Sequence, residues 1–183
     1  MRVITGSARG RRLKELMGTD TRPTTDKVKE GLFSIIQFDI EGRRVLDLFA
    51  GTGQLGIEAL SRGAAEAVFV EKRMDAVKLV RENLELCQLS ENAKVHAGEA
   101  LAYLRSGEKF DLIFLDPPYG SDLLDQALER IVTFDICRAH GIIVAESAAE
   151  KVLSPVAAPY RLYREYRYGK IKLTVYHRDG NEV

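Results

Sequence analysis

The sequence predicts an α/β fold in which helices cover both faces of a mostly parallel sheet. Between residues 43 and 150, apolar runs typical of buried strands alternate with segments of helical periodicity, which is the pattern of a doubly wound sheet. The run 112–115 is apolar throughout, as in parallel strands buried on both faces. Residues 160–166 and 171–176 instead alternate apolar and polar side chains, which indicates a closing antiparallel pair.

Each element of this fold has its own signal. The strands before the closing pair are expected at 45–49, 67–71, 94–96, 110–115 and 141–145. Helices are expected at 55–60, 101–104 and 123–132, and one more helix carries an apolar face made of Val77, Val80, Leu84 and Cys87. A helix nearer the N-terminus begins at an N-cap supplied by Thr24 or Thr25, and it buries Val28, Leu32, Ile35 and Ile36.

The chain divides into a short extension and one domain. Residues 1–20 form a basic extension too short to fold alone, and Gly6 and Gly10 favour a turn or a mobile loop in it. Residues 21–183 suffice for one domain, and 45% hydrophobic with 30% charged residues is a globular composition.

Several protein classes are excluded by the composition. There is no run of about 18 apolar residues to cross a membrane and no secretory signal at the start. Cys87 and Cys137 have no metal-binding or disulfide-framework spacing, so we expect buried free thiols. We therefore expect a cytoplasmic monomer with no membrane attachment and no metal.

The formal net charge of zero hides an uneven distribution. Residues 1–44 contain ten basic against six acidic side chains, residues 45–150 ten against eighteen, and residues 151–178 seven against one. Basic ends that flank an acidic middle can attract a polyanion even in a neutral molecule. Charge runs are equally often just solvated faces.

A glycine-rich loop after the first strand indicates a nucleotide-binding site. The segment 51–56 matches GxGxxG between a strand and a helix, where the backbone can approach a ligand closely. Glu71 ends the next strand, and a carboxylate there can accept both hydroxyls of an adenosine ribose. Asp47, inside the first strand, suits a cationic group such as an amino-acid ammonium better than the pyrophosphate of NAD.

The tetrapeptide Asp116-Pro117-Pro118-Tyr119 follows a buried strand and therefore lies beside the glycine loop at the carboxyl edge of the sheet. The Asp116 carboxylate and the Pro117 carbonyl can accept hydrogen bonds from an amine, and Tyr119 offers a flat face on which a base can stack. The alternative is a turn stiffened by its prolines.

With these motifs the sequence resembles the Rossmann-like methyltransferases that use S-adenosylmethionine, and more narrowly the bacterial RsmD family. Four stretches carry the resemblance: Ile4-Thr5-Gly6 with Gly10-Arg11-x-Leu13, Arg22-Pro23-Thr24-Thr25-Asp26-x-Val28, Asp47 to Gly53, and Asp116 to Tyr119. The family methylates the exocyclic N2 amine of one guanine, guanine 966, in 16S ribosomal RNA. The resemblance implies a seven-stranded sheet with an antiparallel last strand, and a substrate inside the small ribosomal subunit or its assembly intermediate.

Three sets of residues follow from the motifs and the resemblance. The catalytic set is Asp116, Pro117, Pro118 and Tyr119. The set expected to bind S-adenosylmethionine is Thr24, Asp47, Phe49, Gly51, Gly53, Glu71, Lys72, Glu99, Ala100 and Asp116. Glu99 stands where the family often has Asp. The set expected to bind RNA is Arg2, Arg9, Arg11, Arg12, Lys14, Arg22 and Lys27.

Three other functions stay open from the residues alone. An adenine amine methyltransferase acting on RNA or DNA would use the same tetrapeptide. An NAD-dependent oxidoreductase would use the same glycine loop. An RNA-binding module without catalysis would keep the basic ends but would have no need for Asp47, Glu71 and Asp116 together.

Overall fold

The computed structural model describes residues 1–18 and 25–180, and a seven-stranded sheet organises them. The strands are β1 (Arg44–Asp47), β2 (Glu66–Glu71), β3 (Ala93–Ala97), β4 (Phe110–Leu115), β5 (Cys137–Ala148), β6 (Tyr160–Tyr168) and β7 (Ile171–Arg178). Their order is β3-β2-β1-β4-β5-β7-β6. β1 to β5 pair in parallel, while β7 is antiparallel to both β5 and β6. The predicted α/β fold with an antiparallel last strand is confirmed.

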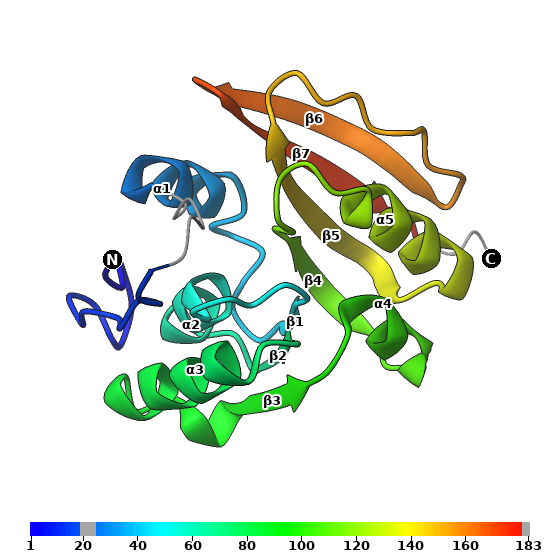
Figure 1. The fold of residues 1–183 in the computed structure, drawn as a ribbon. Helices are drawn as coiled ribbons and strands as arrows, with labels where there is room; N and C mark the ends of the chain where they lie inside the picture. The colour runs from blue at the N-terminus through cyan, green and yellow to red at the C-terminus, as the bar shows by residue number, and fades with distance from the viewer. Residues whose placement is uncertain (19–24, 181–183) are drawn as a thin grey trace.

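Helices cover both faces of this sheet (Figure 1). They are α1 (Asp26–Ile35), α2 (Gln54–Ser61), α3 (Met74–Leu86), α4 (Ala100–Tyr103) and α5 (Leu123–Phe134), with 3-10 turns at Ser90–Asn92 and Leu104–Ser106. One core joins α1, α2 and α3 to one face through side chains such as Phe33, Ile57 and Val80. A second core joins α4 and α5 to the other face through Ala100 and Ile131.

The strand order brings three strand ends together. β1 pairs with β2 on one side and with β4 on the other, so the chain reverses its direction of winding at β1. In open α/β sheets the crevice at such a switch point, beyond the carboxyl ends of the strands, is where ligands bind. Asp47, Glu71 and Asp116 stand at or just after the ends of β1, β2 and β4.

The first helix begins as its sequence predicts. The Thr25 hydroxyl accepts a hydrogen bond from the Val28 amide, so Thr25 is the N-cap. Val28, Leu32 and Ile36 are buried as expected, whereas Ile35 is only half-buried. Phe33 and the charged Lys29 are buried instead, because α1 packs against the N-terminal segment as well as the sheet.

The N-terminal segment is fixed on the domain, and of the two alternatives predicted for its glycines the turn is confirmed and the mobile loop is not. Residues 1–13 form a tight hairpin with a bridge between Arg2 and Arg12, and its apolar side chains Val3, Ala8 and Leu13 join the core under α1 to α3. Residues 14–18 follow directly, and residues 1–18 together are called the N-terminal hairpin below. A Cβ at Gly6, whose φ is +91°, would lie 1.8 Å from the Ser61 carbonyl oxygen. That close packing leaves Gly6 no freedom to adapt to a partner.

Two smaller expectations can be compared directly with the structure. Cys87 and Cys137 are buried free thiols, as predicted. Among the helices of the described part of the chain, none is long and apolar enough to cross a membrane.

Candidate active site

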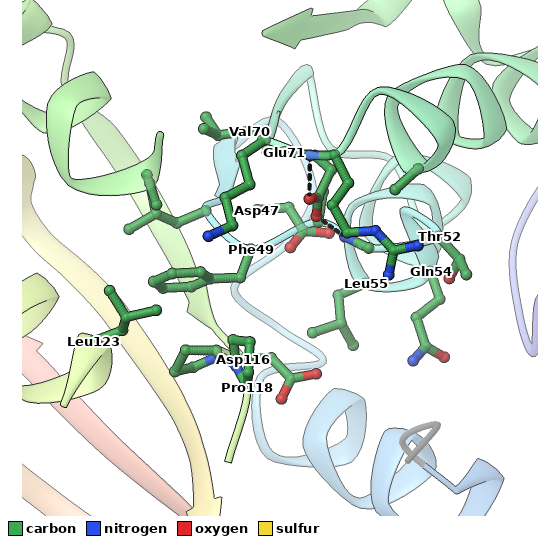
Figure 2. Close-up of a pocket in the computed structure, with 18 of the residues that line it drawn as sticks. Asp47, Phe49, Thr52, Gln54, Leu55, Val70, Glu71, Asp116, Pro118 and Leu123 are labelled. Carbon is green, nitrogen blue, oxygen red and sulfur yellow. Dashed lines mark hydrogen bonds between the residues drawn. The ribbon is translucent and has the colours of Figure 1, made fainter. Parts of the chain in front are cut away.

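A cavity of about 790 Å³ opens at the carboxyl ends of β1, β2 and β4. This volume lies within the usual range for small-molecule sites. Most of the residues expected to bind a cofactor or to catalyse line it together: Asp47, Phe49, Gly51, Glu71, Lys72, Glu99, Ala100, Asp116, Pro117, Pro118 and Tyr119. Figure 2 shows Phe49 and Leu55 between Glu71 and the side formed by Asp116 and Pro118.

Glu71 ties the glycine loop to the end of β2. Its Oε2 accepts a hydrogen bond from the Gly51 amide at 2.9 Å, and its Oε1 accepts one from the Arg73 amide at 2.9 Å (Figure 2). A carboxylate oxygen can accept two hydrogen bonds. Glu71 is therefore held in a defined orientation and retains acceptor sites for a diol.

Asp47 is a buried carboxylate beneath the glycine loop. Its side chain is 1% exposed, and its Oδ2 accepts a hydrogen bond from the Gly56 amide at 3.0 Å. Burial raises the pKa of Asp47 to about 7, with a further contribution from the charge of Glu71, while the Gly56 amide opposes the shift. A cation placed next to Asp47 would favour its ionised form.

Gly53 does not line the cavity, although the motif predicts a binding role for it. Its φ of +82° is the left-handed conformation that glycine adopts readily, and it precedes the first residue of α2. A Cβ on Gly53 would lie 3.2 Å from Val80 of α3. The residue allows the loop to turn and α3 to pack closely behind it.

In the tetrapeptide after β4 the first two residues are largely covered and the last two are exposed. Pro117 is buried, Asp116 is half-buried, and Tyr119 is 44% exposed at the cavity. The Tyr119 hydroxyl donates a hydrogen bond to Oε1 of Glu146 at 3.0 Å. Glu146 belongs to β5 and is 4% exposed. It was not expected at the site, because nothing in the local sequence of β5 distinguishes it.

The N-terminal hairpin also contributes to the cavity wall, which the sequence did not indicate. Met1, Glu15 and Leu16 line the cavity, and the Met1 amino group lies 2.9 Å from Oε1 of Glu15. Thr52 of the glycine loop donates a hydrogen bond to the Met1 sulfur. The hairpin and the glycine loop thus form one side of the cavity.

The residues expected to bind RNA divide into three groups. Arg2, Arg9, Arg11, Arg12 and Lys27 are exposed. Lys14 is exposed too, but its Nζ lies 2.9 Å from Oε2 of Glu82 in an ion pair. Arg22 and Thr24, the latter expected to contact the cofactor, lie outside the described residues.

The acceptor groups and the apolar surface of the cavity suit a cationic nucleoside. Carboxylates from three strand ends can accept hydrogen bonds from hydroxyl, ammonium and amine groups, while Phe49, Leu55 and Val70 supply apolar surface for a base and a methylene chain. In the stretches 1–18 and 25–180 there is no group of three His, Cys, Asp or Glu side chains able to hold a metal ion.

Fold and site together define the class: this is a methyltransferase of the Rossmann-like type that depends on S-adenosylmethionine. The chain belongs to the RsmD family, since the family model described as "Conserved hypothetical protein 95" matches residues 1–177. The resemblance based on the sequence motifs is confirmed, and membership decides for S-adenosylmethionine against NAD.

Relatives agree with this assignment over nearly the whole chain. "Putative rRNA methyltransferase YlbH" of Bacillus subtilis is 42% identical, with 98% of this chain and all of that protein aligned. "Ribosomal RNA small subunit methyltransferase D" of Escherichia coli is 34% identical, covering 98% of this chain and 91% of the relative. The solved structure of "Putative methyltransferase yhhF from Escherichia coli" superposes with a TM-score of 0.89 at 34% identity and covers 99% of both chains.

Proposed function

We propose that this protein transfers a methyl group from S-adenosylmethionine to the exocyclic N2 amine of one guanine in 16S ribosomal RNA. The observation that carries the proposal is the placement of the Asp116–Tyr119 tetrapeptide beside Glu71 and Asp47 in one cavity. The name of the Escherichia coli relative, a small-subunit ribosomal RNA methyltransferase, supports the choice of RNA. The choice of guanine N2 rests on the family resemblance.

The cofactor's sulfonium, when bound, supplies an already activated methyl group, so the residues of the chain have to bind and orient. Glu71 would accept hydrogen bonds from the ribose hydroxyls, using the lone pairs that are not occupied by the Gly51 and Arg73 amides. Asp47 would accept from the ammonium of the methionine part, while Phe49 would offer apolar surface to the adenine and Glu99 and Ala100 would lie near it in the cavity wall. Lys72 and Gly51 complete this part of the wall.

Asp116 and Pro117 hold the amine of the target base. A guanine amine is a weak nucleophile because its lone pair delocalises into the ring. Hydrogen bonds from its two protons to the Asp116 carboxylate and the Pro117 carbonyl draw it toward tetrahedral geometry and fix its direction of attack. Asp116 stabilises the positive charge that develops on the nitrogen and takes the released proton. Pro118 stiffens the turn.

The target base must leave its stack to enter the cavity, and Tyr119 then serves as its stacking partner. The exposed arginines of the N-terminal hairpin bind phosphates of the surrounding RNA. Lys27, which is exposed at the start of α1, extends the proposed contact with RNA to this helix. We expect the substrate to be the assembled small subunit or an assembly intermediate, acted on by a monomer.

The decisive test is transfer of a labelled methyl group to small ribosomal subunits lacking the modification, to naked 16S ribosomal RNA and to DNA, in parallel. We expect label in one guanine N2 of the subunit or its RNA, located by mapping the modified base. Label in an adenine would support the adenine methyltransferase instead. No transfer to any of the three, from protein that binds S-adenosylhomocysteine, would contradict the proposal.

A further inference from the structure

The Tyr119 side chain carries a contact that base stacking alone does not require. Its ring is 44% exposed at the cavity, yet its hydroxyl donates to Oε1 of Glu146 at 3.0 Å. A stacking platform needs only the face of the ring. The hydroxyl therefore has another use, and its partner determines where the ring lies.

Glu146 is a rigid anchor for this hydroxyl. It lies on β5, which is paired with β4 on one side and with β7 on the other, opposite Leu173. Leu115, the last residue of β4, pairs with Ala145, so Glu146 stands level with the first residue of the tetrapeptide. With 4% of its surface exposed, Glu146 has little room to move.

The hydrogen bond between Tyr119 and Glu146 joins an exposed side chain to a buried one. A half-exposed tyrosine is free to change its rotamer unless its far end is held. A hydrogen bond from a hydroxyl to a carboxylate is among the stronger neutral-to-charged bonds. Holding the hydroxyl therefore holds the plane of the ring before any substrate arrives.

We propose that Glu146 is a positioning residue of the reaction, which fixes the Tyr119 ring in the orientation that receives the flipped target base. The inference rests on the proposed function, because it takes Tyr119 as the stacking partner of that base. Glu146 acts through Tyr119 and does not line the cavity in which the methyl group is transferred.

The experiment compares variants in methyl transfer to small ribosomal subunits, with kcat and KM for the subunit measured separately. Tyr119→Phe keeps the ring and removes the donor, so we expect kcat/KM for the subunit to fall about fivefold, the range expected for one lost hydrogen bond. Glu146→Leu should cause a similar loss, and Glu146→Gln, which keeps an acceptor oxygen, should retain most of the activity. Tyr119→Ala should lose more, because the stacking face goes as well.

A double variant separates positioning from general support of the fold. If Glu146 acts through Tyr119, Glu146→Leu in the Tyr119→Phe background should cost nothing further, while affinity for S-adenosylhomocysteine stays that of the wild type. Glu129→Gln, an exposed carboxylate on α5, is the matched control and should change neither parameter.

Several outcomes would overturn the inference. Wild-type kcat/KM in Tyr119→Phe would do so even if Glu146→Leu failed to fold, and so would fully additive losses in the double variant. Failure of the wild-type protein to methylate any RNA would instead contradict the proposed function, so the two results can be told apart.

Discussion

At the scale of single residues, the site depends on carboxylates that the backbone holds in place. The amides of Gly51 and Arg73 orient Glu71, and the amide of Gly56 orients Asp47. Each amide belongs to the glycine loop, the first turn of α2 or the turn after β2. The loop therefore does more than leave space for a ligand, because its N–H groups also fix the acceptors around it.

Glu71→Ala should weaken cofactor binding more than RNA binding. Losing a pair of charge-assisted hydrogen bonds to the ribose costs on the order of 1.5–3 kcal/mol, or about tenfold or more in affinity. Calorimetry with S-adenosylhomocysteine measures this loss, and Glu91→Ala, an exposed carboxylate before β3, is the control. Unchanged affinity in a folded Glu71→Ala protein would refute the ribose assignment.

Asp47 should make cofactor binding depend on pH. Its pKa of about 7 in the free protein means that it is mostly protonated below pH 7. A cationic ligand group favours the carboxylate, so binding must release that proton at lower pH. Affinity for S-adenosylhomocysteine should rise as pH increases from 5.5 to 7.5, by at most about tenfold per unit, and then level off.

Calorimetry in buffers of different ionisation enthalpy can detect the released proton directly. In Asp47→Asn the affinity should be weaker at pH 7.5 and nearly independent of pH. A wild-type affinity that stays flat across this range would mean that Asp47 does not face a cation.

Asp116→Ala should reduce methyl transfer below about one hundredth of the wild-type rate, because the amine loses both its orienting acceptor and its proton acceptor. Single-turnover transfer with bound RNA measures the chemical step separately from binding. Asp122→Ala, an exposed carboxylate at the start of α5, serves as the control. Normal turnover by a folded Asp116→Ala protein would mean that the tetrapeptide serves only as a structural turn.

At the scale of elements, one buried side chain joins the hairpin, α3 and the glycine loop. Asn83 of α3 is fully buried, donates to the carbonyls of Lys14 and Thr52, and accepts from the Lys14 amide at 2.8 Å. The N-terminal hairpin is thus hydrogen-bonded to the same residue as the glycine loop. The backbone that carries the arginines of the hairpin is therefore held in place on the domain.

Replacing Arg9, Arg11 and Arg12 together by Ala should weaken RNA binding and leave cofactor affinity unchanged. These side chains are exposed, and with fewer phosphate contacts the binding of RNA releases fewer counterions. The measurement is RNA affinity against salt concentration, where the variant should give a shallower slope. Equal affinity with parallel lines would move the RNA surface to Arg161, Arg164, Arg167 and Lys170 of the C-terminal hairpin.

At the scale of the whole molecule, a buried ion pair attaches the N-terminal segment to two helices. Lys29 Nζ of α1 lies 3.2 Å from Oε2 of Glu58 in α2, and both side chains are fully buried. Lys29 also donates to the Arg2 carbonyl, while Glu58 accepts from the amides of Ile4 and Thr5. Burial lowers the pKa of Lys29, and the neighbouring Glu58 counteracts that shift.

Glu58→Ala should destabilise the protein by about 3–5 kcal/mol, since it leaves a buried ammonium group without its counter-charge. Urea unfolding measures the loss, and proteolysis within residues 1–18 should become faster. Glu58→Gln keeps one acceptor oxygen for the amide of Ile4 or Thr5 and should lose less. If Glu58→Ala unfolded at the wild-type urea concentration, the pair would not be what holds the hairpin.

The sequence alone determined the order and type of the elements and the residues at the strand ends. Strand and helix periodicities are local patterns in the sequence. The glycine loop and the tetrapeptide are local too, because each directly follows the strand that positions it. The rule that parallel strands end at one edge then brings Asp47, Glu71 and Asp116 together without further information.

Only the tertiary structure decided which distant residues support the tetrapeptide, the glycine loop and the N-terminal hairpin from behind. Glu146, Asn83 and Glu58 meet their partners across 27 to 69 positions of the chain. No periodicity encodes such contacts, because they depend on how strands and helices pack and not on the residues beside them. The same reason explains the N-terminal hairpin: its glycines and arginines look like those of a mobile arm, and the packing of Val3, Ala8 and Leu13 against the core makes it part of the cavity.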